Sequence, residues 1–217
     1  MRLADAALPD TAAVSAALEV ATRFCSPSLL AHSVRSWYWA QGFAAVTGVA
    51  RHAIRTAAMK ERRPSEVLSI LNEALLRSRP RYTFCTVAYV RVQPSEGRLR
   101  LTVCSAGHPL PLVLRADGRV ETAGLPGTLL GVFPDPELKD RVLELRPGDA
   151  LLLYTDGVTE ELAPPGTTGG GSLADLLASN RGLDAHSIAS SVERAVVEAR
   201  PRPPRDDIAI LVARVKP

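Results

Sequence analysis

The chain has 217 residues, of which 46% are hydrophobic and 23% are charged, and its formal net charge is +3. This composition is typical of a globular protein with one core and excludes a chain that is disordered throughout. The arginines are scattered without interleaved aromatic residues, so the small positive charge does not predict nucleic-acid binding.

No apolar run approaches the roughly 18 residues of a membrane span, and the N-terminus carries no apolar signal segment. Cys25, Cys85 and Cys104 lie in apolar contexts without a Cys-x-x-Cys pair, so we expect reduced thiols and a cytoplasmic protein.

The N-terminal region has the pattern of amphipathic helices. Residues 11–23 carry Val14, Leu18 and Ala21 on one face, and a second helix restarts at Ser26-Pro27. Residues 8–40, which include His32-Ser33-Val34-Arg35, resemble the start of an HD-domain hydrolase, where the equivalent histidine binds metal. The other interpretation of His32 is a polar residue on an amphipathic helix, because one imidazole does not make a metal site.

Two more helices are predicted before the first strand, over residues 43–59 and 65–78. Apolar residues recur at helical spacing in both, and Pro64 stands at the first position of the second helix. Each helix has an apolar face that needs a sheet or a partner to cover it.

The strands are predicted from apolar runs and alternating patterns. They are residues 83–92, 98–106, 110–114, 119–120, 141–145, 151–154 and 208–215. Residues 83–92 are apolar on both alternating sets, which is typical of a centrally buried strand, and residues 94–97 are predicted to be a hairpin loop. Residues 98–106 alternate as a strand covered on one side only.

Helices are also predicted between the last two strands. Residues 163–171 are rich in Gly, Pro and Thr and predict a loop. Ser172 and Asp175 have the spacing of a capping box, and Asp184 is the expected N-cap of a longer amphipathic helix.

Two acidic sites stand at the ends of apolar strands. Asp156 follows the run at residues 151–154, and Asp206-Asp207 opens the last strand. If these strands pair antiparallel, their carboxylates meet at one edge of the sheet. Clustered carboxylates are costly unless a cation lies between them, and aspartate ligands favour magnesium or manganese. The alternative is that Asp156-Gly157 is only a turn after a core strand.

A series of short motifs resembles the SpoIIE-type catalytic domain of the metal-dependent (PPM) protein serine/threonine phosphatases. In chain order the motifs are Pro64-Ser65-Glu66-Val67-Leu68 with Leu71-Asn72, Phe84-Cys85-Thr86, Ser105-Ala106-Gly107-His108-Pro109-Leu110-Pro111-Leu112, Gly127 to Gly131, Leu145-Arg146-Pro147-Gly148-Asp149, Tyr154-Thr155-Asp156-Gly157-Val158-Thr159-Glu160 and Asp206-Asp207-Ile208-Ala209. Each motif is short, and their common order and spacing make the resemblance specific.

The resemblance implies an α+β fold, a sandwich of antiparallel sheets flanked by helices, over residues 42–217, with residues 1–41 as a helical extension. It implies that a metal-activated water hydrolyses phosphoserine or phosphothreonine on a regulatory phosphoprotein, such as an anti-anti-sigma-type protein, without a protein nucleophile. By resemblance, Asp156 and Asp206 are ligands of manganese or magnesium, and Asp207, Gly157 and His108 support the site. His108 can also be interpreted as a loop histidine hydrogen-bonded to backbone.

The sequence departs from the family near its N-terminus. Family members carry a Gly-Gly-Asp-x-Tyr-Asp strand and a Gly-Asp-Val-x-Gly-x-Gly strand whose Asp bridges two metals, and this sequence contains neither. At most one of the two metals is therefore expected to be liganded, in an N-terminally truncated domain with an edge left for the N-terminal helices or a partner to cover. Three hypotheses remain. The first is an active phosphatase, and the second is an inactive pseudo-phosphatase that binds an anti-sigma-type or anti-anti-sigma-type regulator. The third is an HD-type hydrolase fragment fused to a phosphatase remnant, and the absence of the His-Asp pair that is typical of HD-domain hydrolases counts against it. A homodimer is compatible with each of them.

Overall fold

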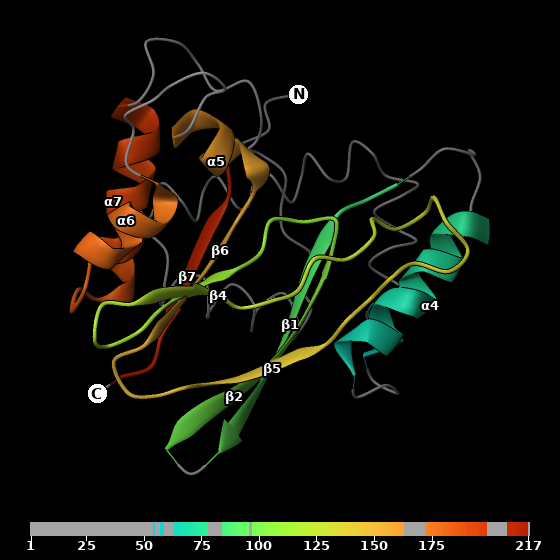
Figure 1. Cartoon of the computed structure of the whole chain (residues 1–217), viewed down its shortest axis with the longest axis horizontal. Coiled ribbons are helices and arrows are strands. Elements are labelled where there is room, and N and C mark those ends of the chain that lie inside the picture. The colour runs from blue at the N-terminus through green and yellow to red at the C-terminus, as the bar shows by residue number, and fades with distance from the viewer. Residues whose placement is uncertain are drawn as a thin grey trace, which may run out of the picture.

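In a computed structural model of the protein, two antiparallel sheets pack face to face, with helices on both outer sides (Figure 1). The structure describes residues 54, 57–58, 63–77, 84–95, 97–162, 172–198 and 208–216. Several predicted features lie outside these residues: the N-terminal helices with His32, the loop at residues 163–171, and Asp206 and Asp207. Of the predicted helix at residues 43–59, the described residues Ile54, Ala57 and Ala58 are helical.

The described elements alternate short strands and helices along the chain. The helices are α4 (Pro64–Arg77), α5 (Asp156–Leu162), α6 (Leu173–Ser179) and α7 (Ala185–Glu198). The strands are β1 (Val87–Ser95), β2 (Arg98–Ala106), β3 (Leu112–Leu114), β4 (Val120–Thr122), β5 (Arg141–Leu145), β6 (Ala150–Tyr154) and β7 (Ile210–Arg214). One sheet has the order β1-β2-β5 and the other β4-β3-β6-β7, and every pairing is antiparallel. The predicted α+β sandwich is confirmed. None of the described helices is long and apolar enough to cross a membrane.

Helix α4 covers the outer face of the three-stranded sheet. Its buried Leu68 and Leu71 pack in one cluster with Cys104 and Ala106 of β2. The other face of the sheet, which carries Val103, packs against the four-stranded sheet. The prediction that residues 98–106 are covered on one side only is therefore wrong for the second half of β2, where α4 buries the face that carries Cys104 and Ala106.

Strand β1 is an edge strand in the described part of the chain, because it pairs with β2 alone. Among the described residues, the strand predicted to be central is therefore an edge strand, and its apolar pattern has a physical reason. Tyr89 faces the cluster under α4 and Val90 faces the core between the sheets, so an edge strand covered on both faces has the same apolar pattern as a central one. The turn into β2 is also tighter than predicted, because Ser95 already pairs with Arg98.

The four-stranded sheet is covered on its outer face by α6 and α7. Ile188 and Val192 of α7 are buried against Leu152 of β6 and Val212 of β7. The Ser172–Asp175 capping box is present at α6, and Asp184 Oδ1 accepts the Ser187 backbone N–H at 2.8 Å, so both predicted N-terminal caps are confirmed.

Candidate functional site

Strands β6 and β7 place Asp156 at the edge of the sheet where the chain enters β7. They pair antiparallel, with Tyr154 opposite Ile210. The pairing continues past the strands, because the Thr155 backbone N–H donates to the Ala209 carbonyl at 3.1 Å and the Ala209 N–H donates to Thr155 Oγ1 at 2.9 Å. The antiparallel pairing on which the predicted site depends is present, and it places Ala209, just before β7, beside Thr155.

Asp156 is the first residue of helix α5, where the sequence predicts only the end of a strand or a turn. The Val158 N–H donates to the Thr155 carbonyl at 3.0 Å, which closes the first helical turn. The Asp156 side chain is exposed, and its Oδ1 accepts the N–H of the buried Gly157 at 3.1 Å. A carboxylate in the first turn of a helix interacts favourably with the helix dipole, and the exposed Asp156 has this position in α5.

His108 lies where the two sheets approach one another near Asp156. Its Nδ1 is 3.1 Å from the hydroxyl of Thr86, which directly precedes β1 in the three-stranded sheet. The ring is also near the Tyr154 carbonyl and the Asp156 carboxylate, at the end of β6 in the four-stranded sheet. His108 thus connects the two layers on the side of the sandwich that carries Asp156.

Burial lowers the pKa of the His108 imidazole below its ordinary value. The Asp156 carboxylate and the Tyr154 carbonyl raise the pKa, but they do not outweigh the loss of solvation. A neutral ring has one donor and one acceptor nitrogen, and a threonine hydroxyl can pair with either. The Thr86 contact is therefore compatible with both tautomers of His108.

The turn that carries His108 is held by close backbone contacts. Ser105 Oγ donates to the His108 carbonyl at 2.7 Å, and the Gly107 N–H donates to the Gly127 carbonyl at 2.9 Å. Gly107 has a φ of +66°, and a Cβ there would lie 2.7 Å from the Cβ of Leu129. A Cβ on Gly127 would lie 2.1 Å from the Ser105 carbonyl oxygen. The sequence reasoning did not assign roles to Thr86, Ser105 or Gly127, although all three lie in the motifs that carry the resemblance.

The described residues do not by themselves make up a metal site. Among them, no group of three or more His, Cys, Asp or Glu side chains could hold a metal ion. Asp156 supplies one carboxylate, and the other predicted aspartates, Asp206 and Asp207, lie outside the described residues. The described part of the site therefore accounts for a single oxygen ligand.

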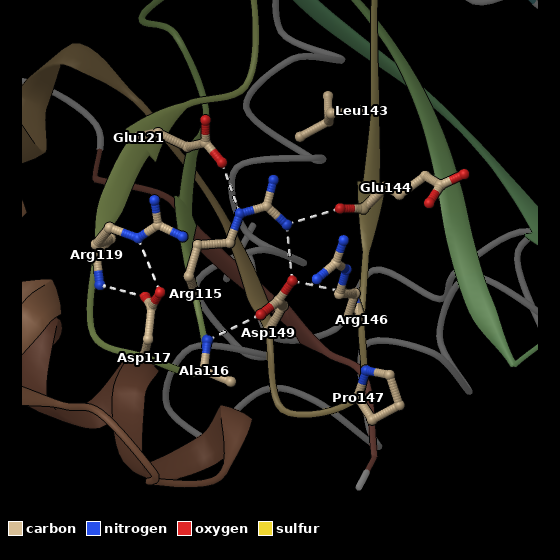
Figure 2. Close-up of a pocket in the computed structure, with 10 residues that line it drawn as sticks. All are labelled: Arg115, Ala116, Asp117, Arg119, Glu121, Leu143, Glu144, Arg146, Pro147 and Asp149. Atoms are coloured by element: carbon tan, nitrogen blue, oxygen red, sulfur yellow. Dashed lines mark hydrogen bonds and ion pairs between the residues drawn. The ribbon is translucent and has the colours of Figure 1, made fainter.

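A separate hollow lies at the opposite end of β6. It has a volume of 590 Å³ and is lined by both acidic and basic side chains (Figure 2). Its centre is the buried Asp149, which accepts hydrogen bonds from Arg115 Nη1 at 2.7 Å and from the backbone N–H groups of Ala116 and Arg146 at 2.8 and 3.0 Å. Arg115 Nε also binds Glu121 at 2.6 Å. These paired charges join the β3–β4 and β5–β6 turns, which indicates a structural role.

The fold is that of the PPM phosphatase class. Its features are two antiparallel sheets packed face to face, helices on both outer faces, and an aspartate at the β6–β7 edge. The profile of the family described as Stage II sporulation protein E (SpoIIE) matches residues 43–216, and the chain belongs to this family.

Solved structures of bacterial phosphatase domains are similar to this chain. The SiaA-PP2C domain of Pseudomonas aeruginosa is 26% identical with a TM-score of 0.60, over 78% of this chain and 67% of that one. The RsbU and RsbW domains of a Mycobacterium tuberculosis protein are 24% identical with a TM-score of 0.59, over 80% of this chain. The phosphatase domain of the Bacillus subtilis cell fate determinant SpoIIE, presoaked with Mn, is 17% identical with a TM-score of 0.50, over 76% of this chain and 70% of that one.

The matches differ in how much of each relative they cover. This chain spans 48% of the length of the Mycobacterium tuberculosis structure. The family match begins at residue 43, so the resemblance of residues 8–40 to HD-domain hydrolases stays a prediction.

Proposed function

We propose that this chain is a protein serine/threonine phosphatase domain of the SpoIIE type that depends on manganese or magnesium and acts on a regulatory phosphoprotein. The observation that supports this most directly is the antiparallel pairing of β6 with β7 inside the family match. Asp207 and Asp206 precede Ile208 by one and two residues. Because consecutive Cα atoms are about 3.8 Å apart, the Asp206 Cα is at most roughly 8 Å from that of Ile208.

The proposed ligands are Asp156 and Asp206. Both offer carboxylate oxygens, the donors that hard divalent cations prefer, and the Asp156 Oδ2 has no hydrogen bond within the described part of the chain. A bound cation would supply Lewis acidity toward the oxygens of a phosphoryl group. In this proposal Asp207 and Gly157 support the two ligands, and His108 positions the turn that faces them.

The proposal includes a helical extension over residues 1–41 and a phosphatase domain over residues 42–217. One similar structure combines RsbU and RsbW domains in a single protein, which supports a regulatory protein as partner. We propose a phosphoprotein of the anti-anti-sigma type, or an anti-sigma-type regulator, as that partner. A cytoplasmic location and a homodimer stay predictions.

A second candidate function is a pseudo-phosphatase that binds the regulator without turnover. Two observations favour it. The sequence contains neither of the family's N-terminal aspartate motifs, and the described residues contain no group of three or more metal-ligand side chains. In this case the fold would act as a binding surface, with at most one cation bound.

Metal binding is tested by titrating manganese into the wild type and the Asp156→Asn variant by calorimetry. We expect Asp156→Asn to weaken binding by at least about tenfold, because even residues behind the ligands contribute that much to metal affinity. Asp117→Asn is the matched control, since Asp117 is an exposed aspartate in the turn between β3 and β4, beyond the other end of the sheet. Identical curves for Asp156→Asn and the wild type would contradict the proposed site.

Catalysis is tested by manganese-dependent hydrolysis of a phosphoserine peptide. The phosphatase proposal predicts turnover that Asp206→Asn abolishes and Asp117→Asn leaves unchanged. Turnover of this kind excludes the pseudo-phosphatase. Manganese binding without turnover at any metal concentration supports the pseudo-phosphatase and overturns the enzymatic proposal.

A further inference from the structure

An apolar surface lies beside the C-terminal half of α4. We call it the α4 patch, and its members are Leu76, Phe84, Val132 and Phe133, with exposed fractions of 40%, 64%, 46% and 52%. Two of the chain's four phenylalanines are therefore exposed in one region. Single exposed apolar side chains are ordinary on a protein surface, whereas a group of them indicates a binding surface.

On the side of the α4 patch away from the helix, backbone hydrogen bonds join the segment that carries Phe84 to the segment that carries Val132 and Phe133. The Cys85 N–H donates to the Leu130 carbonyl, and the Leu130 N–H donates to the Cys85 carbonyl, both at 3.0 Å. Phe84 directly precedes Cys85, and Gly131 and Val132 directly follow Leu130, so this antiparallel bridge brings the two short segments side by side. The segments that carry Phe84 and Val132 are thus neighbours although they are far apart in the sequence.

On the helix side of the α4 patch, one buried side chain of α4 hydrogen-bonds the backbone of the segment that carries Val132 and Phe133. Asn72, which is 1% exposed, accepts the Gly131 N–H at 2.8 Å through Oδ1 and donates from Nδ2 to the Phe133 carbonyl at 2.9 Å. Leu76 stands one helical turn after Asn72 on the same side of α4. The α4 patch is therefore a preformed surface, which lowers the entropic cost of binding.

We propose that the α4 patch is the docking surface for residues 11–40 of the same chain. Apolar residues recur at helical spacing in this segment, so it has an apolar face that needs cover. The segment also contains both tryptophans of the chain, Trp37 and Trp39, together with Tyr38 and Phe24. Aromatic side chains contribute most to apolar binding surfaces.

The path of the chain supports this occupant. Ile54 packs against the apolar cluster under α4, and Ala57 is 2% exposed. The segment is therefore connected to the α4 region through residues 41–53, which span about 20 Å if helical and more if extended. Helix α4 is itself about 21 Å long, so the segment can reach the α4 patch. A tether of this length holds the segment at a millimolar effective concentration, which favours it over a partner from solution.

The test uses tryptophan fluorescence of the full chain, because Trp37 and Trp39 are the only tryptophans and both report on the docked segment. The variant is Phe84→Ser with Phe133→Ser, measured by emission wavelength and acrylamide quenching. We expect the emission to shift to the red and the ratio of docked to undocked segment to fall roughly 30-fold, from the lost burial of two phenyl rings.

The matched control is Val197→Ser with Leu183→Ser. Val197 is 65% exposed, like Phe84, and Leu183 is 41% exposed. Val197 lies on α7, on the opposite outer face of the sandwich from α4 (Figure 1). The control should keep the wild-type emission, and far-UV circular dichroism of both variants should match that of the wild type.

Three results would overturn the proposal. Wild-type tryptophans that are quenched as fully as those of the unfolded chain would mean that the segment is not covered at all. A wild-type emission that shifts to the red on dilution would assign the α4 patch to a second copy. An unchanged emission in the Phe84→Ser and Phe133→Ser variant would place the segment elsewhere. Emission that is independent of concentration and shifts only in that variant supports docking within one chain, whether or not the protein is a phosphatase.

Discussion

Substitution of Gly127 by alanine is predicted to disturb the turn that carries His108. The added Cβ would lie 2.1 Å from the backbone oxygen of Ser105 and 2.8 Å from the backbone oxygen of Glu137. An ordinary contact between carbon and oxygen is about 3.3 Å or longer, so the backbone must move by roughly 1 Å. Both obstacles are backbone atoms, which no change of rotamer can displace.

The cost can be estimated from the contacts that this movement strains. Overpacking costs about 1–3 kcal/mol, and each of two neighbouring hydrogen bonds is worth about 1 kcal/mol. These bonds are Gly107 N–H to the Gly127 carbonyl at 2.9 Å and Thr128 N–H to the Glu137 carbonyl at 3.0 Å. Alanine also lowers the conformational entropy of the unfolded chain, which stabilises the folded state by about 0.4–1 kcal/mol and offsets part of this cost. The free energy of unfolding should therefore fall by about 2–4 kcal/mol.

Gly124→Ala is the matched control, three positions away. A Cβ there would meet only side-chain atoms, Leu110 Cδ2 at 3.3 Å and Val103 Cγ1 at 3.4 Å. These side chains can shift slightly, so we expect a change within about 1 kcal/mol. Urea unfolding followed by circular dichroism measures both variants.

A second measurement reports on the turn itself. Burial raises the pKa of Cys104, the neighbour of Ser105, to about 11, so its thiol should react slowly in the wild type. Gly127→Ala should increase the labelling rate of Cys104, followed by mass spectrometry of its peptide. If Gly127→Ala costs no more stability than Gly124→Ala and leaves this rate unchanged, the backbone contact does not hold the turn.

Two other predictions concern the hollow and the histidine. Asp149→Ala should lower the free energy of unfolding, measured by urea denaturation, by about 3 kcal/mol. The reason is that it removes a buried carboxylate and leaves three hydrogen-bond donors, including Arg115, without this acceptor. Arg119→Ala removes an exposed ion pair and should have no measurable effect, so equal losses in the two variants would refute the structural role of the hollow. Burial lowers the pKa of His108 in the folded state, so the unfolded chain binds more protons as the pH falls. The wild type should therefore lose more stability than His108→Gln below about pH 6.5, in thermal melts from pH 7.5 to 5, and parallel curves would contradict this.

Helix caps and strand bounds that depend on local sequence signals are predicted well. The capping box at Ser172 and Asp175 and the cap at Asp184 are both present, because each depends on groups within three residues. The bounds of β2 and β5 also agree with the prediction, since strong apolar alternation is bounded by turn residues in each case. Such features depend on the order of residues along a short stretch.

Features that depend on neighbours in space are predicted less well. The pattern of residues 83–92 shows that both faces are covered, but it does not distinguish an edge strand from a central one. Helix α5 is missed because its seven residues, with Gly157 at the second position, are too short for a helical period to be visible. Asn72 of α4 lies in one of the motifs that carry the resemblance, but its role as a buried hydrogen-bonding residue is not visible in the sequence, because its partners are about sixty residues away.

The sequence by itself determined the family, the order of most elements and the acidic residue at the end of β6, because these follow from local pattern and from motifs in a fixed order. Only the tertiary structure decided that His108 lies between Thr86, which precedes β1 in one layer, and the end of β6 at Asp156 in the other. It also decided that Phe84 and Phe133 form one surface beside α4. The physical reason is that these contacts depend on how two sheets and a helix pack together, and no short stretch of sequence encodes that packing.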